Sequence, residues 1–212
     1  MVDINHAYRG EKEEHQFSLD NINLKFKPGE LVFIIGGNGS GKSTLIKLIT
    51  GLYNPDRGQI LLNSISVQDD NREWYRQQFS VVFYDFYLFE RLLGIEANQE
   101  TEIQNYLNLL EIEHKVTVKD GNLSTTNLSQ GQRKRLALLT AYLEDRPIYV
   151  FDEWASDQDP VFKEIFYKKL LPQLKSRGKT VIAVSHDDRY FTECDRLIKL
   201  DYGRIIEDRY LS

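Results

Sequence analysis

Short apolar runs alternate along this chain with amphipathic segments of helical period. The run Leu31-Val32-Phe33-Ile34-Ile35 is apolar at every position, which is typical of a strand buried on both faces of a sheet. Residues 101–110 differ, because apolar side chains recur there at three- and four-residue spacing and predict an amphipathic helix. The segments predicted as strands are 2–8, 17–26, 31–35, 59–63, 79–83, 147–151, 180–184, 195–200 and 204–208. The segments predicted as helices are 44–50, 70–78, 101–110, 128–143 and 159–175.

Strands that alternate with helices predict an α/β fold, with a mainly parallel sheet flanked by helices on both faces. The two N-terminal strands, joined by a charged hairpin tip at residues 10–15, are expected as an antiparallel addition. From residue 94 the pattern becomes helical and poor in strands. We therefore predict one domain over residues 1–212. Its core would comprise about 1–93 and 145–212, and about 94–144 would form an inserted helical subdomain.

A glycine-rich segment follows the apolar run at residues 31–35 and fits the P-loop pattern G-x-x-x-x-G-K-[ST]. Its glycines let the backbone wrap tightly and turn N–H groups toward a phosphate, and the helix that follows adds the positive end of its dipole. Lys42 would place a positive charge at the β- and γ-phosphates, and Ser43 would offer a hydroxyl to Mg²⁺. The preceding strand and following helix favour a nucleotide site over a purely structural turn. The expected nucleotide-binding residues are Gly37, Asn38, Gly39, Ser40, Gly41, Lys42, Ser43 and Thr44.

Two carboxylates follow the apolar run at residues 148–151. In an open α/β sheet, the carboxyl ends of the strands face the ligand crevice, so Asp152 and Glu153 are expected there. Asp152 could hold Mg²⁺ through its water shell, and Glu153 could orient an attacking water and accept its proton. The alternative is that the two acids are solvated at a strand edge. The P-loop pattern favours the nucleotide site over this alternative.

The segment Leu128-Ser129-Gln130-Gly131-Gln132 precedes these acids and opens a predicted helix. Ser129 is placed as an N-cap with a hydroxyl available to a ligand, and Gly131 would allow a close backbone approach. A second phosphate-binding helix terminus is one interpretation, and a simple helix cap is the other.

With the P-loop before it and the acidic strand after it, this segment resembles the signature sequence of ATP-binding cassette (ABC) proteins. The resemblance runs from Val2 to about Asp208 and implies a P-loop NTPase fold and an Mg²⁺-dependent ATPase. It assigns the switch histidine to His186, which follows the strand at 180–184, although a lone histidine can also be structural. It also assigns the D-loop, the loop after the catalytic acid, to residues 154–159, with Ser156 and Asp159 at the matching positions.

The resemblance further matches Tyr8 to the aromatic residue that stacks on adenine, though Tyr8 could equally be a core residue of its strand. Two positions depart from the family pattern. Tyr84 stands where a glutamine that approaches Mg²⁺ is expected, and a phenol is a poor Mg²⁺ ligand. Gln130 stands where many members have glycine, with little expected consequence. More narrowly, the segments 33–39, 82–89, 151–160 and 185–191 look like those of bacterial cyclic-peptide and siderophore-peptide exporters.

The resemblance implies a head-to-tail homodimer that clamps two ATP molecules. Each would be bound by Gly39, Gly41, Lys42 and Ser43 of one copy and by Ser129, Gly131 and Gln132 of the other. Glu153 would polarise water, and His186 would contact the γ-phosphate. A membrane-spanning partner, in the same polypeptide or a separate chain, would place the protein at the cytoplasmic face of the bacterial plasma membrane. The alternative is a soluble ABC-type switch; a kinase or GTPase would leave the signature unexplained, and no Asn-Lys-x-Asp motif is present.

Composition adds several expectations. The net charge is −5 with 28% charged residues, and no basic stripe with interleaved aromatics indicates a nucleic-acid partner. The short run 133–135 is interpreted as a solvated helix face, and the single Cys194 as a packed thiol. Neither a signal peptide nor an apolar window of membrane-spanning length is seen in the sequence. The aromatic-rich run 84–89 would either receive a helix of a membrane partner or pack on the helical subdomain.

Overall fold

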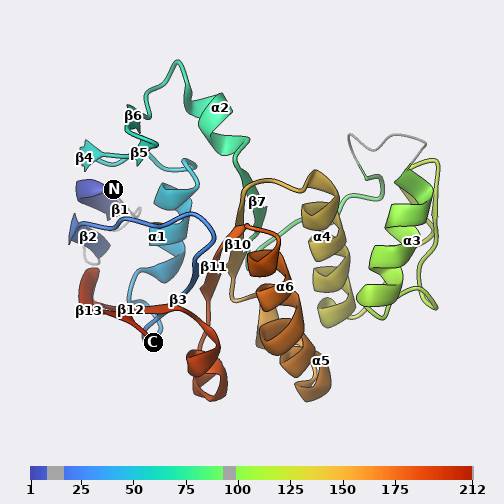
Figure 1. Cartoon of the computed structure of the whole chain (residues 1–212). Coiled ribbons are helices and arrows are strands. Elements are labelled where there is room, and N and C mark those ends of the chain that lie inside the picture. Colours follow the sequence, from blue (N-terminus) through green and yellow to red (C-terminus); the bar gives the residue numbers. More distant parts are fainter. Residues whose placement is uncertain (9–16, 93–98, 212) are drawn as a thin grey trace.

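The computed structural model describes residues 1–8, 17–92 and 99–211. A six-stranded sheet in the order β13-β12-β3-β11-β10-β7 forms its centre (Figure 1). The strands from β12 to β7 run parallel, and β13 pairs antiparallel with β12 at one edge. This confirms the predicted α/β class and the closing hairpin. The strands are β3 (Leu31–Ile35), β7 (Phe79–Val82), β10 (Ile148–Asp152), β11 (Thr180–Val184), β12 (Arg196–Asp201) and β13 (Arg204–Tyr210).

Both faces of this sheet are covered by helices, which explains the unbroken apolar run of β3. Successive side chains of a strand point to opposite faces. Leu31 and Phe33 accordingly belong to the core cluster on the face of α4, α5 and α6, and Val32 and Ile34 to the cluster on the face of α1. Figure 1 shows α1 on one side of the sheet and α4–α6 on the other. The bounds are α1 (Lys42–Ile49), α4 (Gln130–Glu144), α5 (Pro160–Ile165) and α6 (Leu171–Ser176).

The predicted antiparallel addition is present as a three-stranded sheet in the order β2-β1-β4. Its second strand ends at Ile22, earlier than expected, after Asn21 adopts a left-handed φ of 52°. The expected strand at 59–63 is instead divided at Ile60, which lies between two short strands, β4 and β5. The second of these ends at Leu62, because Asn63 and Ser64 take positive φ values and form the turn from β5 to β6. The predicted hairpin tip at 10–15 lies outside the described residues. The elements are β1 (Val2–Tyr8), β2 (Phe17–Ile22), β4 (Arg57–Gln59), β5 (Leu61–Leu62), β6 (Ile65–Ser66) and α2 (Arg72–Arg76).

The helix α3 (Glu100–Leu109) packs against α4 and lies outermost in Figure 1. In the chain between these two helices, a short hairpin is formed by β8 (Val118–Lys119) and β9 (Asn122–Leu123). It was not predicted, because the sequence there is polar. Asp120 and Gly121 both have positive φ, as a two-residue hairpin turn of the primed type requires. Because α4 also packs on β7 of the core, the division into a core and a helical subdomain stays a prediction.

The helix predicted at 159–175 is interrupted by a π-helical turn, η3 (Phe166–Leu170), between α5 and α6. Pro172 stands in the first turn of α6. Proline has no N–H to donate to the carbonyl four residues earlier, and local widening of a helix is one way to accommodate it.

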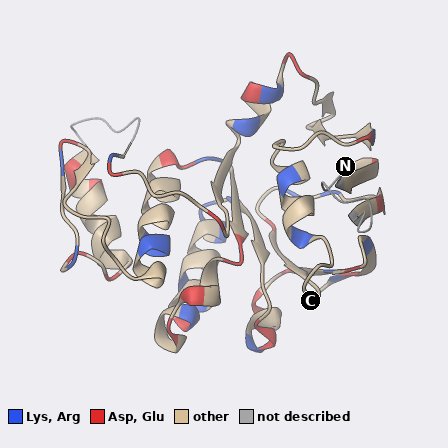
Figure 2. Ribbon diagram, turned by 180° about the vertical axis from the view of Figure 1, so that it is seen from behind, with Lys and Arg blue, Asp and Glu red and all other residues tan. Residues whose placement is uncertain are grey.

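Charge and burial confirm one expectation and correct another. Figure 2 shows the basic run at 133–135 as one short blue band on α4. The run was expected to be a solvated helix face, and this expectation is wrong, because Lys134 is 0% and Arg135 9% exposed. Cys194 is buried, as predicted, and its burial raises the pKa of the thiol to about 11. Over the described ranges, no helix has both the length and the apolar character needed to cross a bilayer.

Candidate functional site

Three neighbouring parallel strands bring the predicted site residues to one edge of the sheet. In the order β3-β11-β10, the carboxyl end of β3 leads into the P-loop, that of β11 into His186, and that of β10 into Asp152 and Glu153. These segments are far apart in the sequence. They meet because the carboxyl ends of parallel strands lie at the same edge, where open α/β sheets bind ligands.

The P-loop holds its lysine against its own backbone. Lys42 Nζ donates to the carbonyl oxygens of Gly36 at 3.1 Å and Gly37 at 2.9 Å. Burial lowers the pKa of Lys42, while the nearby carboxylates of Glu153 and Asp152 oppose that shift. The backbone of Gly36 lies so close to Leu200 and to the Ser40 hydroxyl that a side chain could not be accommodated there. The loop therefore places an ammonium group beside the two acids.

The hydroxyl of Ser43 donates to Asp152 Oδ1 at 3.3 Å, across the sheet edge. Asp152 is 2% exposed, and burial raises the pKa of its carboxyl. A hydroxyl beside a carboxylate is a pair of hard oxygen donors, which suits Mg²⁺ when substrate phosphates and waters complete the coordination. Among the described residues, no group of three or more His, Cys, Asp or Glu side chains could hold a metal alone. The pair therefore fits a metal that arrives with a phosphorylated substrate.

Glu153 and His186 form the second polar pair, with Glu153 Oε1 and His186 Nε2 2.8 Å apart. Glu153 has a φ of 50°, a left-handed conformation that costs a non-glycine residue about 1 kcal/mol or more. Both side chains line a cavity of about 330 Å³, together with Ser156, Ser185 and Asp187. A carboxylate and an imidazole facing one small cavity can together position a water molecule and transfer its proton.

The signature segment lies at the start of α4. Ser129 is exposed and its hydroxyl oxygen accepts from the Gln132 N–H at 3.3 Å, while Gln132 Oε1 accepts from the Ser129 N–H at 3.2 Å. This capping box leaves the hydroxyl proton of Ser129 available to an acceptor. Among the hydrogen bonds and ion pairs of the described residues, none joins Ser129, Gly131 or Gln132 to the P-loop of the same chain.

Gly131 instead lies against the D-loop, whose residues 154–157 form the short helix η2 (Trp154–Asp157). A Cβ atom at Gly131 would be 2.7 Å from the carbonyl oxygen of Asp157, and the Gly131 carbonyl accepts from Gln158 Nε2 at 3.0 Å. The close approach expected of Gly131 is thus present, and its partner is backbone of this chain.

We expect Gly131→Ala to destabilise this junction, because a backbone carbonyl cannot move aside as a flexible side chain could. The melting temperature should fall by several degrees, since overpacking of this kind costs about 1–3 kcal/mol. Thermal unfolding followed by circular dichroism measures it, with Gly37→Ala as control, because a Cβ there meets nothing within 4 Å and Gly37, like Gly131, has no positive φ. An unchanged melting temperature in Gly131→Ala would contradict the packing described.

The two D-loop residues singled out in the sequence have separate contacts. Asp159 Oδ1 caps α5 by accepting from Val161 and Phe162 N–H groups, and its other oxygen lies 2.8 Å from Arg135 Nη2. Ser156 Oγ accepts from Lys134 Nζ at 3.0 Å. The two basic residues of α4 that hold this loop were missed, because nothing in a three-residue basic run indicates burial.

The remaining two candidates are placed differently. Tyr8 is the last residue of β1 and pairs with Phe17, while its side chain lies outside the description. Tyr84 follows β7, is 53% exposed and lies with its ring centroid 5.0 Å from Lys134 Nζ. Stacking on adenine by Tyr8 and metal contact by Tyr84 both stay predictions.

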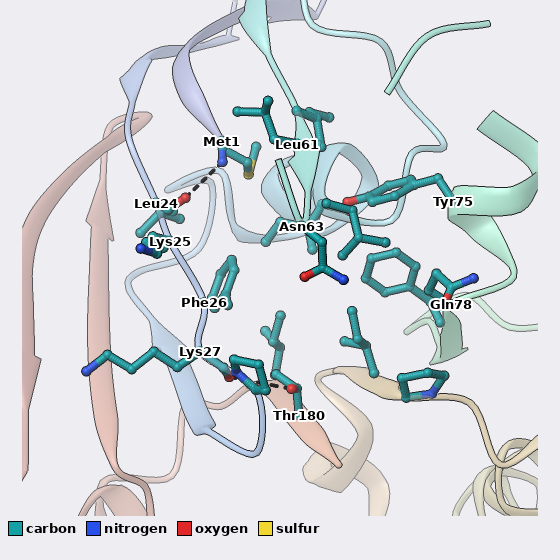
Figure 3. Close-up of a pocket in the computed structure, with 18 of the residues that line it drawn as sticks. Met1, Leu24, Lys25, Phe26, Lys27, Leu61, Asn63, Tyr75, Gln78 and Thr180 are labelled. Atoms are coloured by element: carbon teal, nitrogen blue, oxygen red, sulfur yellow. Dashed lines mark hydrogen bonds between the residues drawn. The ribbon is translucent and has the colours of Figure 1, made fainter. Parts of the chain in front are cut away.

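A larger cavity, of about 910 Å³, lies at the other edge of the sheet (Figure 3). Its lining includes Phe79, Ile148 and Thr180, which begin β7, β10 and β11, and Figure 3 shows Phe26 and Asn63 around the same space. Because these residues stand at the amino ends of the parallel strands, the cavity is separate from the acids and the P-loop.

Comparison with known proteins agrees with this geometry. The profile of the family described as ABC transporter matches residues 19–156. The chain belongs to this family. The energy-coupling factor transporter ATP-binding protein EcfA1 of Mycoplasmoides gallisepticum is 30% identical to it over 217 residues, which cover 96% of the chain and 75% of EcfA1. The P-loop NTPase fold and the ATPase class expected from the sequence are thereby confirmed.

Two further relatives are informative. The ATP-binding protein SyrD of Pseudomonas syringae pv. syringae is 51% identical over 212 residues, which cover 98% of this chain. The chain spans 38% of SyrD's length. A dimeric structure of the ATP-binding cassette MJ0796, in a post-hydrolysis state bound to ADP and Pi, matches with a TM-score of 0.84 and 26% identity. That match covers 100% of this chain and 97% of the other.

Proposed function

We propose that this chain is the motor domain of an ABC exporter, which hydrolyses ATP to drive export of a peptide-like substrate. The observation that carries the proposal is the convergence of Lys42, the Ser43–Asp152 pair and the Glu153–His186 pair on one sheet edge. The segments that look like those of bacterial cyclic-peptide exporters support a peptide-like cargo. The alpha-hemolysin translocation ATP-binding protein HlyB of Escherichia coli is 31% identical over 211 residues and supports export and a place at the inner face of the plasma membrane.

Each residue of the site has a role that follows from its chemistry. Lys42 exchanges its two loop carbonyls for phosphate oxygens of ATP and neutralises charge that develops on the γ-phosphoryl group. Ser43 and Asp152 would hold Mg²⁺, which supplies electrostatic stabilisation of the phosphates when bound. Glu153 orients a water and accepts its proton, and His186, at 2.8 Å, orients that carboxylate and contacts the γ-phosphate.

A head-to-tail homodimer completes the site. The Ser129 hydroxyl is exposed and bonded only within its own helix turn, so it is available to ATP bound by a second copy. Two dimeric cassette structures resemble this chain, with TM-scores of 0.84 and 0.83, and support this arrangement. ATP binding would then join the two copies, and hydrolysis would weaken the interface.

The membrane-spanning partner would dock at the aromatic segment after β7. Tyr84, Tyr87 and Phe89 are 53%, 74% and 59% exposed, whereas Phe86 packs against the core. Such a group of large exposed aromatics is unusual on a free surface and typical of an interface. Packing on the helical subdomain, the alternative from the sequence, accounts for Phe86 and for the contact of the Tyr84 ring with Lys134, and leaves Tyr87 and Phe89 exposed.

Turnover by the purified chain tests the proposal. We expect ATP hydrolysis that requires Mg²⁺, is abolished by EDTA and is restored by excess Mg²⁺. Ser43 and Asp152 would act by holding the metal ion, and it is the metal ion that would stabilise the phosphate charge. Phosphate release measures it, and light scattering with and without ATP measures dimer formation. Hydrolysis unaffected by EDTA would contradict the Mg²⁺ assignment, and a chain that stays monomeric at saturating ATP under conditions that block hydrolysis would contradict the dimer.

A further inference from the structure

Lys134 of α4 is a fully buried lysine whose ammonium is bound on several sides. Its Nζ lies 2.7 Å from Asp157 Oδ2, 3.0 Å from Ser156 Oγ and 2.9 Å from the carbonyl oxygen of Glu153. The hydrogen bond from Lys134 holds the pKa of the Asp157 carboxyl below its usual range. An ammonium group has three protons to donate, so these acceptors use its whole capacity. The cost of burying the charge is offset only while all of them are in place.

The contact with Glu153 has a particular consequence. Glu153 is held at a φ of 50°, and its carbonyl oxygen also accepts from Ser156 Oγ at 2.7 Å. The backbone of Lys134 contributes as well, since its carbonyl accepts from Trp154 Nε1 at 2.9 Å. A strained backbone persists only where its surroundings over-determine it. Lys134 therefore fixes the residue that carries the candidate catalytic base, through its main chain and without touching its carboxylate.

The same ammonium faces the aromatic segment after β7. The Tyr84 ring centroid lies 5.0 Å from Lys134 Nζ, within the range of a cation–π contact. Tyr84 is half-exposed and stands on the segment whose Tyr87 and Phe89 are also exposed. A single buried charge thus touches the exposed aromatic segment, the D-loop and the backbone of Glu153.

We propose that Lys134 is a positioning residue that couples Tyr84 to the backbone of Glu153 and to the D-loop. A displacement of Tyr84 would alter the ammonium position and so the aim of the Glu153 carboxylate at water. This inference deepens the proposed ATPase function and rests on it. It assigns a role to the tyrosine that stands where the family has a glutamine: the ring acts on the buried cation and need not bind a metal.

Lys134→Met tests the proposal, because methionine has a similar length and no charge. We expect kcat to fall about 10- to 100-fold, as misplacement of a catalytic group by about 1 Å does, while KM for ATP changes less than twofold. Tyr84→Leu should lower kcat by a smaller factor. Tyr84→Phe, which retains a π face, should have the wild-type kcat. In the Lys134→Met background, Tyr84→Leu should have no further effect.

The controls separate positioning from folding. Lys168→Met removes an exposed lysine that pairs with Glu164 and should leave kcat and KM unchanged. Melting temperatures of all variants are measured alongside, and the exposed Tyr84 variants keep the test open if Lys134→Met does not fold. A kcat of Lys134→Met within twofold of wild type, or equal effects of Tyr84→Leu and Tyr84→Phe, would overturn the proposal. If the wild-type chain hydrolyses no ATP, the proposed function itself fails.

Discussion

Glu153→Gln should abolish most turnover while ATP still binds. The amide keeps the size of the side chain and can retain the contact with His186, which lies 2.8 Å from Glu153 Oε1. It cannot accept the proton of an attacking water, and loss of a positioned general base costs about 10²- to 10⁴-fold in rate. Because nucleotide then persists between the two copies, we expect a stable ATP-bound dimer where the wild type returns to monomer.

Phosphate release and light scattering measure the two effects on the same samples. Glu164→Gln is a matched control, since Glu164 is exposed, pairs with Lys168 and lies away from the sheet edge. It should hydrolyse ATP at the wild-type rate. Near-normal turnover by Glu153→Gln would show that another group activates the water. Loss of ATP binding in that variant would show that Glu153 contributes to the binding of ATP rather than to the activation of water.

Mixing two inactive variants should restore activity. We expect Lys42→Met, which loses its phosphate contacts, and Ser129→Arg, which blocks the signature, each to lack turnover. In a head-to-tail dimer of the two variants, one site carries both defects and the other carries neither. Half of the dimers in an equal mixture are mixed, so about a quarter of the wild-type rate should return if the sites act independently.

This result depends on the geometry of the clamp. If one chain supplied both the P-loop and the signature of its own site, every site in the mixture would be defective and no activity would return. Circular dichroism of each variant checks folding, and Ser129 is exposed, so an arginine there meets no core. The cap itself contributes about 1 kcal/mol, which a folded protein of this size tolerates.

Much of the core could be predicted from short stretches of sequence. The strands β1, β3 and β11 agree residue by residue with their predicted bounds, and the expected order of strands and helices is present. The misses are local in origin. Positive φ values at Asn21 and at Asn63–Ser64 ended strands that hydrophobicity alone extended, and the Asp120–Gly121 turn formed a hairpin in polar sequence.

Some residues of the candidate site were likewise predicted from the sequence, and others were not. Lys42, Ser43, Asp152, Glu153 and His186 were predicted and lie together, although their roles stay predictions until the variants are measured. The basic run that contains Lys134 and Arg135 was interpreted as a solvated helix face, and the structure shows both residues buried. Hydrophobic periodicity treats a basic run as solvent-facing, and only partners elsewhere in the chain reveal otherwise.

The sequence by itself determined the P-loop, the buried strands and the acids that end β10, because each depends on a few contiguous residues and their backbone geometry. Tertiary structure decided which charges are buried. The Lys134 ammonium contacts Glu153, Asp157 and Tyr84, which belong to segments that meet only when the sheet has formed. A charge becomes stable in the interior only through such long-range partners, so its burial cannot be inferred from its neighbours in the chain.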